Sequence, residues 1–60
     1  MCEATIYVNG KEDFEDVALV EFSDNSIVAR DILGESRVYD PHLKPIKIDL
    51  INNRIDLESR

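Results

Sequence analysis

The stretch IKIDLINNRIDLE, residues 46–58, alternates apolar and polar side chains on either side of an Asn-Asn pair. Alternation with a period of two places successive side chains on opposite faces of a β-strand. Ile46, Ile48 and Leu50 therefore share one face, and Asn52-Asn53 suits the backbone of a tight turn. The stretch predicts an antiparallel hairpin whose returning strand carries a matching apolar face.

Short apolar runs recur through the rest of the chain and are separated by turn residues. Asn9-Gly10 is the strongest hairpin signal, because both residues tolerate a positive φ. Counted with the hairpin, six short strands and no convincing helix predict an all-β fold, a small antiparallel barrel of the SH3-like or OB-like kind. The four remaining strands are expected at residues 2–8, 14–22, 26–32 and 36–39.

Two segments of the chain are less regular. In residues 14–22, Phe14, Val17 and Ala18 fall at helical spacing, whereas Val20 and Phe22 alternate with acidic residues. A strand is the interpretation that we favour there.

The second irregular segment, residues 40–45, holds both prolines of the chain. Since a proline cannot donate a backbone hydrogen bond, we expect this segment to be an irregular connection between strands. Gly34 is expected at a bend or bulge between two strands.

The length of 60 residues predicts a single domain, residues 1–60, with a marginal core. A chain of this size buries only about 60% of the surface that it exposes when unfolded. Its single cysteine provides neither a disulfide framework nor a zinc cluster, so dimerisation is the remaining means of stabilisation and a homodimer is predicted. The residues expected in the core are Ala4, Ile6, Val8, Val20, Phe22, Ile48, Leu50, Ile55 and Leu57.

The net charge of −6 is unevenly distributed, at −7 over residues 1–35 and +1 over residues 36–60. Binding to a phosphate backbone relies on clustered Lys and Arg, and seven such residues in an acidic chain suit it poorly. Nucleic acid is therefore not the expected partner. A small β-barrel that binds RNA is the alternative function, and its contact set would be Arg37, Lys44, Lys47 and Arg54.

The sequence also argues against a membrane protein and against an enzyme. The apolar run at residues 17–20 is far shorter than the roughly 20 residues of a membrane-spanning helix, and no basic stretch precedes an apolar one at the N-terminus. No serine lies in a nucleophile-elbow context, and no phosphate-binding glycine loop is present. We expect a soluble cytoplasmic protein that is not an enzyme.

Cys2 is the residue with the clearest chemical potential. A lone cysteine is a buried apolar residue, a free thiol or an intermolecular ligand. Zinc prefers four tetrahedral ligands, which one cysteine and the distant His42 do not supply. Ni(II) accepts N and S donors in a plane, and the Met1 amine, the Cys2 amide nitrogen and the Cys2 thiolate can form two fused chelate rings around it. In a symmetric dimer, two copies of Cys2 could converge on one ion.

His42 is the only histidine, and it follows Pro41 in the predicted connection. A histidine in such a loop is usually exposed to solvent, and a role as an outlying metal ligand is the second interpretation.

Four segments give the chain a specific resemblance. Residues 1–7 (MCEATIY), 31–35 (DILGE), 46–50 (IKIDL) and 53–58 (NRIDLE) resemble, in this order, the CooT family of accessory proteins of nickel-containing carbon monoxide dehydrogenase. The resemblance covers essentially the whole chain. It implies a homodimeric small β-barrel that binds nickel through the cysteine at position 2, here Cys2, and serves the dehydrogenase or its maturation proteins as a metallochaperone. Related sequences are also described as predicted RNA-binding proteins.

The opening Met1-Cys2 is similar to that of a second group, the hydrogenase maturation chaperones of the HypC type. Those chaperones usually continue with a proline and a glycine, whereas residues 3–6 here read Glu-Ala-Thr-Ile. This departure favours the CooT resemblance.

Overall fold

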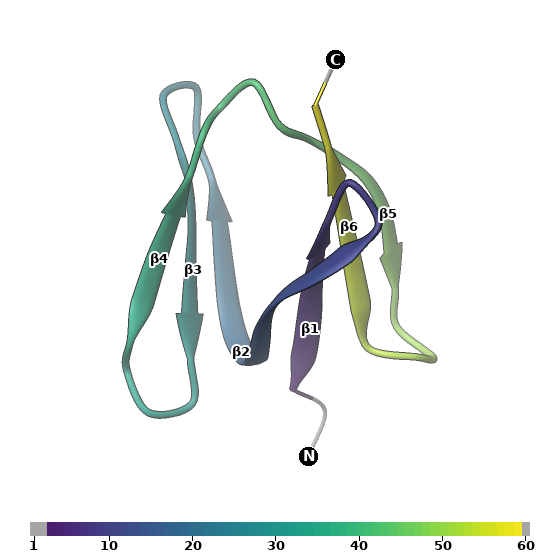
Figure 1. Ribbon diagram of the computed structural model, residues 1–60. Helices are drawn as coiled ribbons and strands as arrows, with labels where there is room; N and C mark the ends of the chain where they lie inside the picture. The colour runs from purple at the N-terminus through teal and green to yellow at the C-terminus, as the bar shows by residue number, and fades with distance from the viewer. Residues whose placement is uncertain (1–2, 60) are drawn as a thin grey trace.

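The computed structural model describes residues 3–59, which form a single six-stranded sheet (Figure 1). The strands follow the chain as β1 (Ala4–Val8), β2 (Lys11–Phe22), β3 (Ile27–Asp31), β4 (Ser36–Tyr39), β5 (Lys44–Asp49) and β6 (Arg54–Glu58). Their order in the sheet is β4-β3-β2-β1-β6-β5. The described residues contain no helix, so the predicted all-β fold and the six strands are confirmed.

The Asn9-Gly10 turn is formed as expected, whereas the second turn is a four-residue loop, residues 50–53, that also includes Leu50. Asn9 and Gly10 both have positive φ, at 52° and 85°, and they join Val8 directly to its partner Lys11. Two consecutive residues with positive φ match the right-handed twist of the flanking strands. Asn53, which directly precedes β6, also has a positive φ, of 54°.

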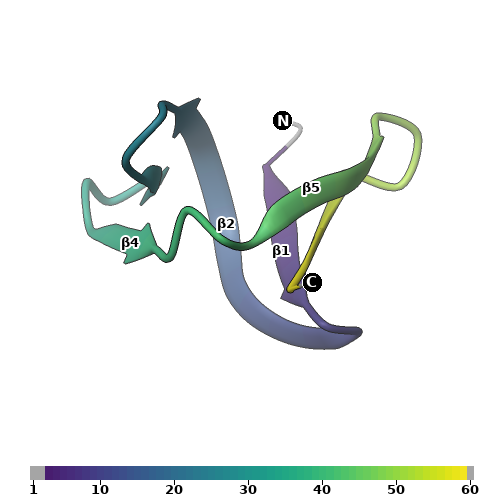
Figure 2. The ribbon, with the colours of Figure 1, turned by 90° about the horizontal axis from the view of Figure 1, so that it is seen from above.

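Strand β2 is 12 residues long and bends in its middle. Its first half pairs with β1 and its second half with β3. Between the pairs Ala4 with Val17 and Ile6 with Phe14, three steps on β2 match two on β1, and Asp16 has a φ of 59°. Such a bulge bends a strand and adds twist. Seen from above, β2 describes a wide arc (Figure 2).

The bulge explains why residues 14–22 resemble a helix in sequence. Phe14 is half-buried and Val17 is buried, so both face the core although three positions separate them. An inserted residue shifts the alternation by one and produces this spacing within a strand.

The curled sheet differs from the expected barrel in two respects. No ladder joins β4 to β5, the two edge strands, so the sheet stays open between them. The pairing of β1 with β6 is parallel, whereas the other four pairings are antiparallel. The cause is the bend in β2, because it reverses the chain within one strand and β6 then reaches β1 running in the same direction (Figure 1).

The core lies on the concave side of the sheet, and the prediction of its members is partly confirmed. Ile6, Ile55 and Leu57 are buried, and Ala4, Val8 and Val20 are half-buried against them. The buried residues Val17, Ile27, Ala29 and Tyr39 were not predicted.

Three predicted core residues are instead exposed, which corrects the expectation. Phe22 is 46% exposed, Ile48 55% and Leu50 83%. Alternation assigns a side chain to one face of the sheet, but it does not show whether another strand covers that face. Phe22 is the last residue of β2, Ile48 belongs to edge strand β5, and Leu50 lies in the loop after β5 rather than in the strand.

A polar cluster ties edge strand β4 to the first half of β2. The Tyr39 hydroxyl donates to Asp13 Oδ2 at 2.6 Å, and Arg37 donates to the same oxygen at 3.0 Å and to the Asp13 carbonyl at 2.8 Å. The hydrogen bond from Tyr39 lowers the pKa of Asp13, while burial and the Asp13 carboxylate raise the pKa of Tyr39. These contacts join two strands that are not neighbours in the sheet and so hold its curl.

We expect Tyr39→Phe to lower the free energy of unfolding by about 1 kcal/mol at neutral pH, because Asp13 loses a charge-assisted hydrogen bond. The lowered pKa of Asp13 stabilises the fold above pH 3.8, its ordinary pKa, and the raised pKa of Tyr39 does so below pH 10.0. The difference in unfolding free energy between wild type and Tyr39→Phe should therefore become smaller below pH 3.8 and above pH 10.0.

Urea denaturation across the pH range measures the effect, and Tyr7→Phe is the matched control because its ring under Arg54 is kept. Equal losses in the two variants would contradict the assigned role of Tyr39.

Candidate functional site

The predicted metal ligands Met1 and Cys2 lie outside the described residues 3–59. In the sequence they precede strand β1, whose surroundings the structure defines. β1 begins at Ala4, which pairs with Val17 of β2. On its other side, the Thr5 amide donates to the Asn53 carbonyl at 2.9 Å. The chain thus enters the sheet between β2 and β6, at a place defined by hydrogen bonds on both sides.

Several connections meet at this same end of the sheet, which we call the N-terminal end. The bend of β2 lies here, and the Ile32 amide of the β3–β4 loop donates to the Asp16 carbonyl at 3.0 Å. The β5–β6 loop also lies here, since Asp49 pairs with Arg54 at the start of β6. Figure 1 shows both loops and the start of β1 at the bottom of the sheet.

His42 lies at the opposite end, in the connection between β4 and β5 (Figure 1). This connection follows Tyr39, the partner of Ile27, and precedes Lys44, the partner of Glu58. The sheet therefore separates His42 from the start of β1 in the same chain. Among the described residues, no three His, Cys, Asp or Glu side chains gather as metal ligands.

The His42 loop has its own local order. The His42 amide donates to Asp40 Oδ1 at 2.8 Å, and His42 Nδ1 lies 2.9 Å from the same oxygen. These contacts lower the pKa of Asp40. The Asp40 carboxylate orients the imidazole ring, but the side chain of His42 is almost fully exposed, as expected for a loop histidine.

An open apolar groove with a volume of about 250 Å³ begins at Ala4 and occupies the uncovered part of the concave face. One wall is the second half of β2, and the other comes from β5 and β6. Its lining residues are Ala4, Val17, Ala18, Leu19, Val20, Phe22, Ile48 and Ile55.

Leu19 is a groove residue that was not predicted from the sequence. A second register shift, between the pairs Val17 with Asp31 and Leu19 with Arg30, again breaks the alternation of β2. Val17 and Leu19 are two apolar residues within three positions, which was the available sequence signal. Its meaning depends on the register shift between them, which is a tertiary feature.

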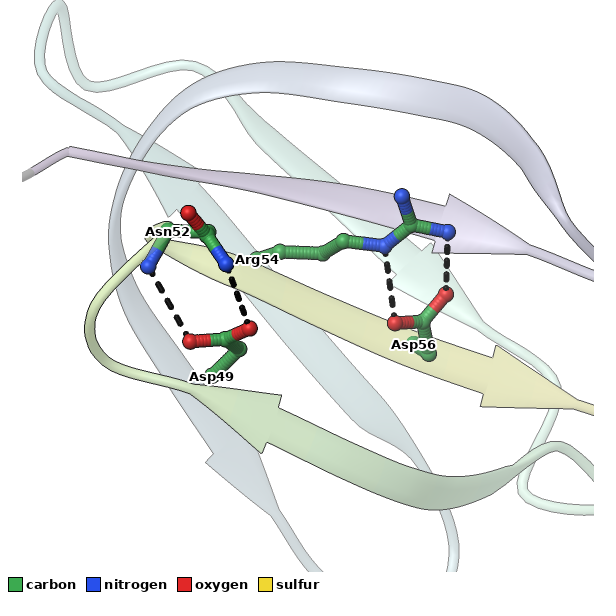
Figure 3. A network of polar contacts seen from close by, with 4 residues as sticks. All are labelled: Asp49, Asn52, Arg54 and Asp56. Carbon is green, nitrogen blue, oxygen red and sulfur yellow. Dashed lines mark hydrogen bonds and ion pairs between the residues drawn. The ribbon is translucent and has the colours of Figure 1, made fainter.

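A second polar cluster engages Arg54. Its Nε donates to Asp56 Oδ2 at 2.9 Å and its NH2 nitrogen to Asp56 Oδ1 at 3.0 Å (Figure 3). The guanidinium carbon lies 3.7 Å from the centre of the Tyr7 ring, within cation–π distance. The two hydrogen bonds lower the pKa of the buried Asp56.

These pairings bear on the predicted RNA contact set. Arg54 and Arg37 both bind carboxylates of their own chain, at Asp56 and Asp13. A phosphate would have to compete with those carboxylates for half of the predicted set.

Within residues 3–59, no helix is long and apolar enough to cross a membrane.

Comparisons with known proteins agree with this architecture. A family model described as the CO dehydrogenase accessory protein CooT matches residues 1–58. An uncharacterized protein of Methanocaldococcus jannaschii is 36% identical over 58 residues, which cover 97% of this chain and 98% of that protein. A crystal structure described as a CooT protein from Carboxydothermus hydrogenoformans superposes with a TM-score of 0.83 at 25% identity and covers 98% of each chain. This chain therefore belongs to the CooT family of CO dehydrogenase accessory proteins.

Proposed function

We propose that this protein is a metallochaperone that binds Ni(II) through Cys2 at a homodimer interface and serves the maturation of nickel-containing carbon monoxide dehydrogenase. Membership of the accessory-protein family supports the role in maturation. The observation that carries the proposed site is the position of Ala4, which begins β1 and also lines the apolar groove. Ala4 follows Cys2 by two positions in the sequence, and it lies on an apolar surface that the described residues leave uncovered.

The groove supports dimerisation on physical grounds. A small domain has a marginal core, and burying further apolar surface stabilises it. Leu19, Phe22 and Ile48 are large, partly exposed side chains around one hollow, the pattern of an interaction site. In an isologous dimer each copy covers the groove of the other, and both chains contribute the same residues. Two copies of Ala4 would then lie at one interface, each two positions after its own Cys2 in the sequence.

The metal chemistry follows from the donors that one chain offers. The Met1 amine, the Cys2 amide nitrogen and the Cys2 thiolate provide up to three donors, and Ni(II) in tetragonal or square-planar geometry takes four. His42 lies in the connection between β4 and β5, at the opposite end of the sheet from the start of β1, so we do not assign it to the set of donors of the same chain. On a twofold axis both chains contribute the same donors, so a four-coordinate ion would take the Cys2 thiolate and one nitrogen donor from each chain.

We expect Cys2→Ser to reduce the affinity for Ni(II) by at least about 100-fold, because a thiolate ligand is lost, whereas His42→Ala should bind like wild type. Wild-type affinity should rise as the pH passes through about 8.5, the ordinary pKa of a thiol, since the ligands bind in their deprotonated form.

Isothermal calorimetry of the three proteins, with the charge-transfer absorption of the bound metal, measures both effects. Unchanged affinity in Cys2→Ser would refute the site, and a loss confined to His42→Ala would move it to the connection between β4 and β5.

For the dimer, we expect Leu19→Asp to weaken association by at least about 100-fold, or ~2.7 kcal/mol, because a carboxylate would be buried in the groove without a partner. Val38→Asp is the matched control, since Val38 is an exposed apolar residue of β4 that does not line the groove. Sedimentation equilibrium at micromolar concentration compares the two, and an undiminished dimer in Leu19→Asp would show that the groove is not the interface.

A further inference from the structure

Two loops at the N-terminal end share one design. The first is the β3–β4 loop, residues 32–35 (Ile-Leu-Gly-Glu), and the second is the β5–β6 loop, residues 50–53 (Leu-Ile-Asn-Asn). Each has four residues, follows an aspartate that ends a strand and starts with two large aliphatic residues. We call them the twin loops. The proposed nickel site does not use either of them.

In the first twin loop, Asp31 holds the backbone in place. Its Oδ1 accepts hydrogen bonds from the Leu33 amide at 3.0 Å and from the Glu35 amide at 2.8 Å. The Gly34 amide donates to the Asp31 carbonyl at 3.1 Å, and Gly34 has a φ of 90° that suits glycine. Ile32 and Leu33 are thus presented by an ordered turn.

In the second twin loop, Asp49 likewise holds the backbone in place. Its Oδ1 accepts from the Ile51 and Asn52 amides, both at 3.0 Å, and its Oδ2 accepts from Asn52 Nδ2 at 2.9 Å (Figure 3). These hydrogen bonds lower the pKa of Asp49, so the carboxylate stays charged and keeps the turn closed at neutral pH. Leu50 and Ile51 are presented in the same way as Ile32 and Leu33.

The aliphatic side chains of the twin loops are among the most exposed in the described structure. Leu33 is 83% exposed, Leu50 83% and Ile51 91%, and none of the three belongs to the core. Loop tips are usually polar, and two adjacent large aliphatic residues at such a tip are costly to solvate. Because the loops are already ordered, little conformational entropy would be lost when a partner covers them.

Charge indicates what kind of partner fits. Carboxylates prevail at the first twin loop, where Asp31 and Glu35 flank the turn and the Asp16 carbonyl accepts from the Ile32 amide. At the second twin loop, Lys47 and Arg54 lie within electrostatic reach of Asp49. A second copy of this chain placed end to end would bring like charges together, which opposes such a contact. An apolar recess with a rim of Lys and Arg is complementary in both respects.

We infer that the twin loops dock this protein onto its client enzyme, a nickel-free carbon monoxide dehydrogenase, through an apolar recess rimmed by basic residues. The inference rests on the proposed function, which supplies the client. β1 starts at the same end of the sheet as the twin loops, so docking there would direct the metal-bearing end toward the acceptor.

The test measures binding of the full-length protein to purified nickel-free carbon monoxide dehydrogenase from the same organism by biolayer interferometry. The double variant Leu33→Ser, Ile51→Ser should bind at least tenfold more weakly, and the matched control Val38→Ser, Ile46→Ser should bind like wild type, since both of its positions are exposed strand residues elsewhere. Glu35→Lys, which tests the charge without touching an aliphatic residue, should also weaken binding. Wild-type binding should weaken as salt rises.

The same proteins are checked for nickel affinity, mass and circular dichroism, which separate the two proposals. Weaker docking of the folded, dimeric double variant with unchanged nickel affinity supports the inference. The inference is overturned if the double variant docks as well as wild type or if wild type does not dock. A monomeric double variant also overturns it, because the loops would then belong to the dimer interface. If the wild-type protein does not bind nickel, the proposed metal site is refuted. Docking that depends on the twin loops would still stand in that case.

Discussion

The bend of β2 at its bulge is the constraint on which the rest of the structure depends. At Asp16 the backbone takes a positive φ, and the strand leaves β1 to pair with β3. One strand therefore serves two parts of the sheet, which gives the sheet its curl and makes the pairing of β1 with β6 parallel. The cluster of Asp13, Arg37 and Tyr39 holds the curled strand against β4 by side-chain contacts rather than by a ladder.

An open sheet has a consequence for a domain of this size. β4 and β5 do not pair with each other, part of the concave face stays uncovered, and Leu19, Phe22 and Ile48 line a groove instead of a core. Among residues 3–59 no further element covers this surface, which is why the groove is the place where we propose that a second copy binds. Ala4, at the start of β1, lies on the same groove.

The N-terminal end and the opposite end of the sheet differ in character. The opposite end holds the exposed His42 loop and the Asn9-Gly10 turn, which are polar and suited to solvent. The N-terminal end combines rigid turns with aliphatic tips and carboxylates. Asp31 and Asp49 make this combination stable, because each carboxylate satisfies backbone amides that a loop would otherwise leave to water. Docking and metal binding are thereby proposed for one end of one sheet.

Local sequence determined the strands, the Asn9-Gly10 hairpin and six of the nine expected core residues, because alternation and turn chemistry act over a few residues. It also singled out Cys2, which lies outside the described residues. The tertiary structure alone decided that Phe22, Ile48 and Leu50 are exposed, that Tyr39 is buried, and that His42 and the start of β1 lie at opposite ends. These outcomes depend on which strands pair after β2 bends, and pairing between distant segments leaves no periodic signal in the sequence.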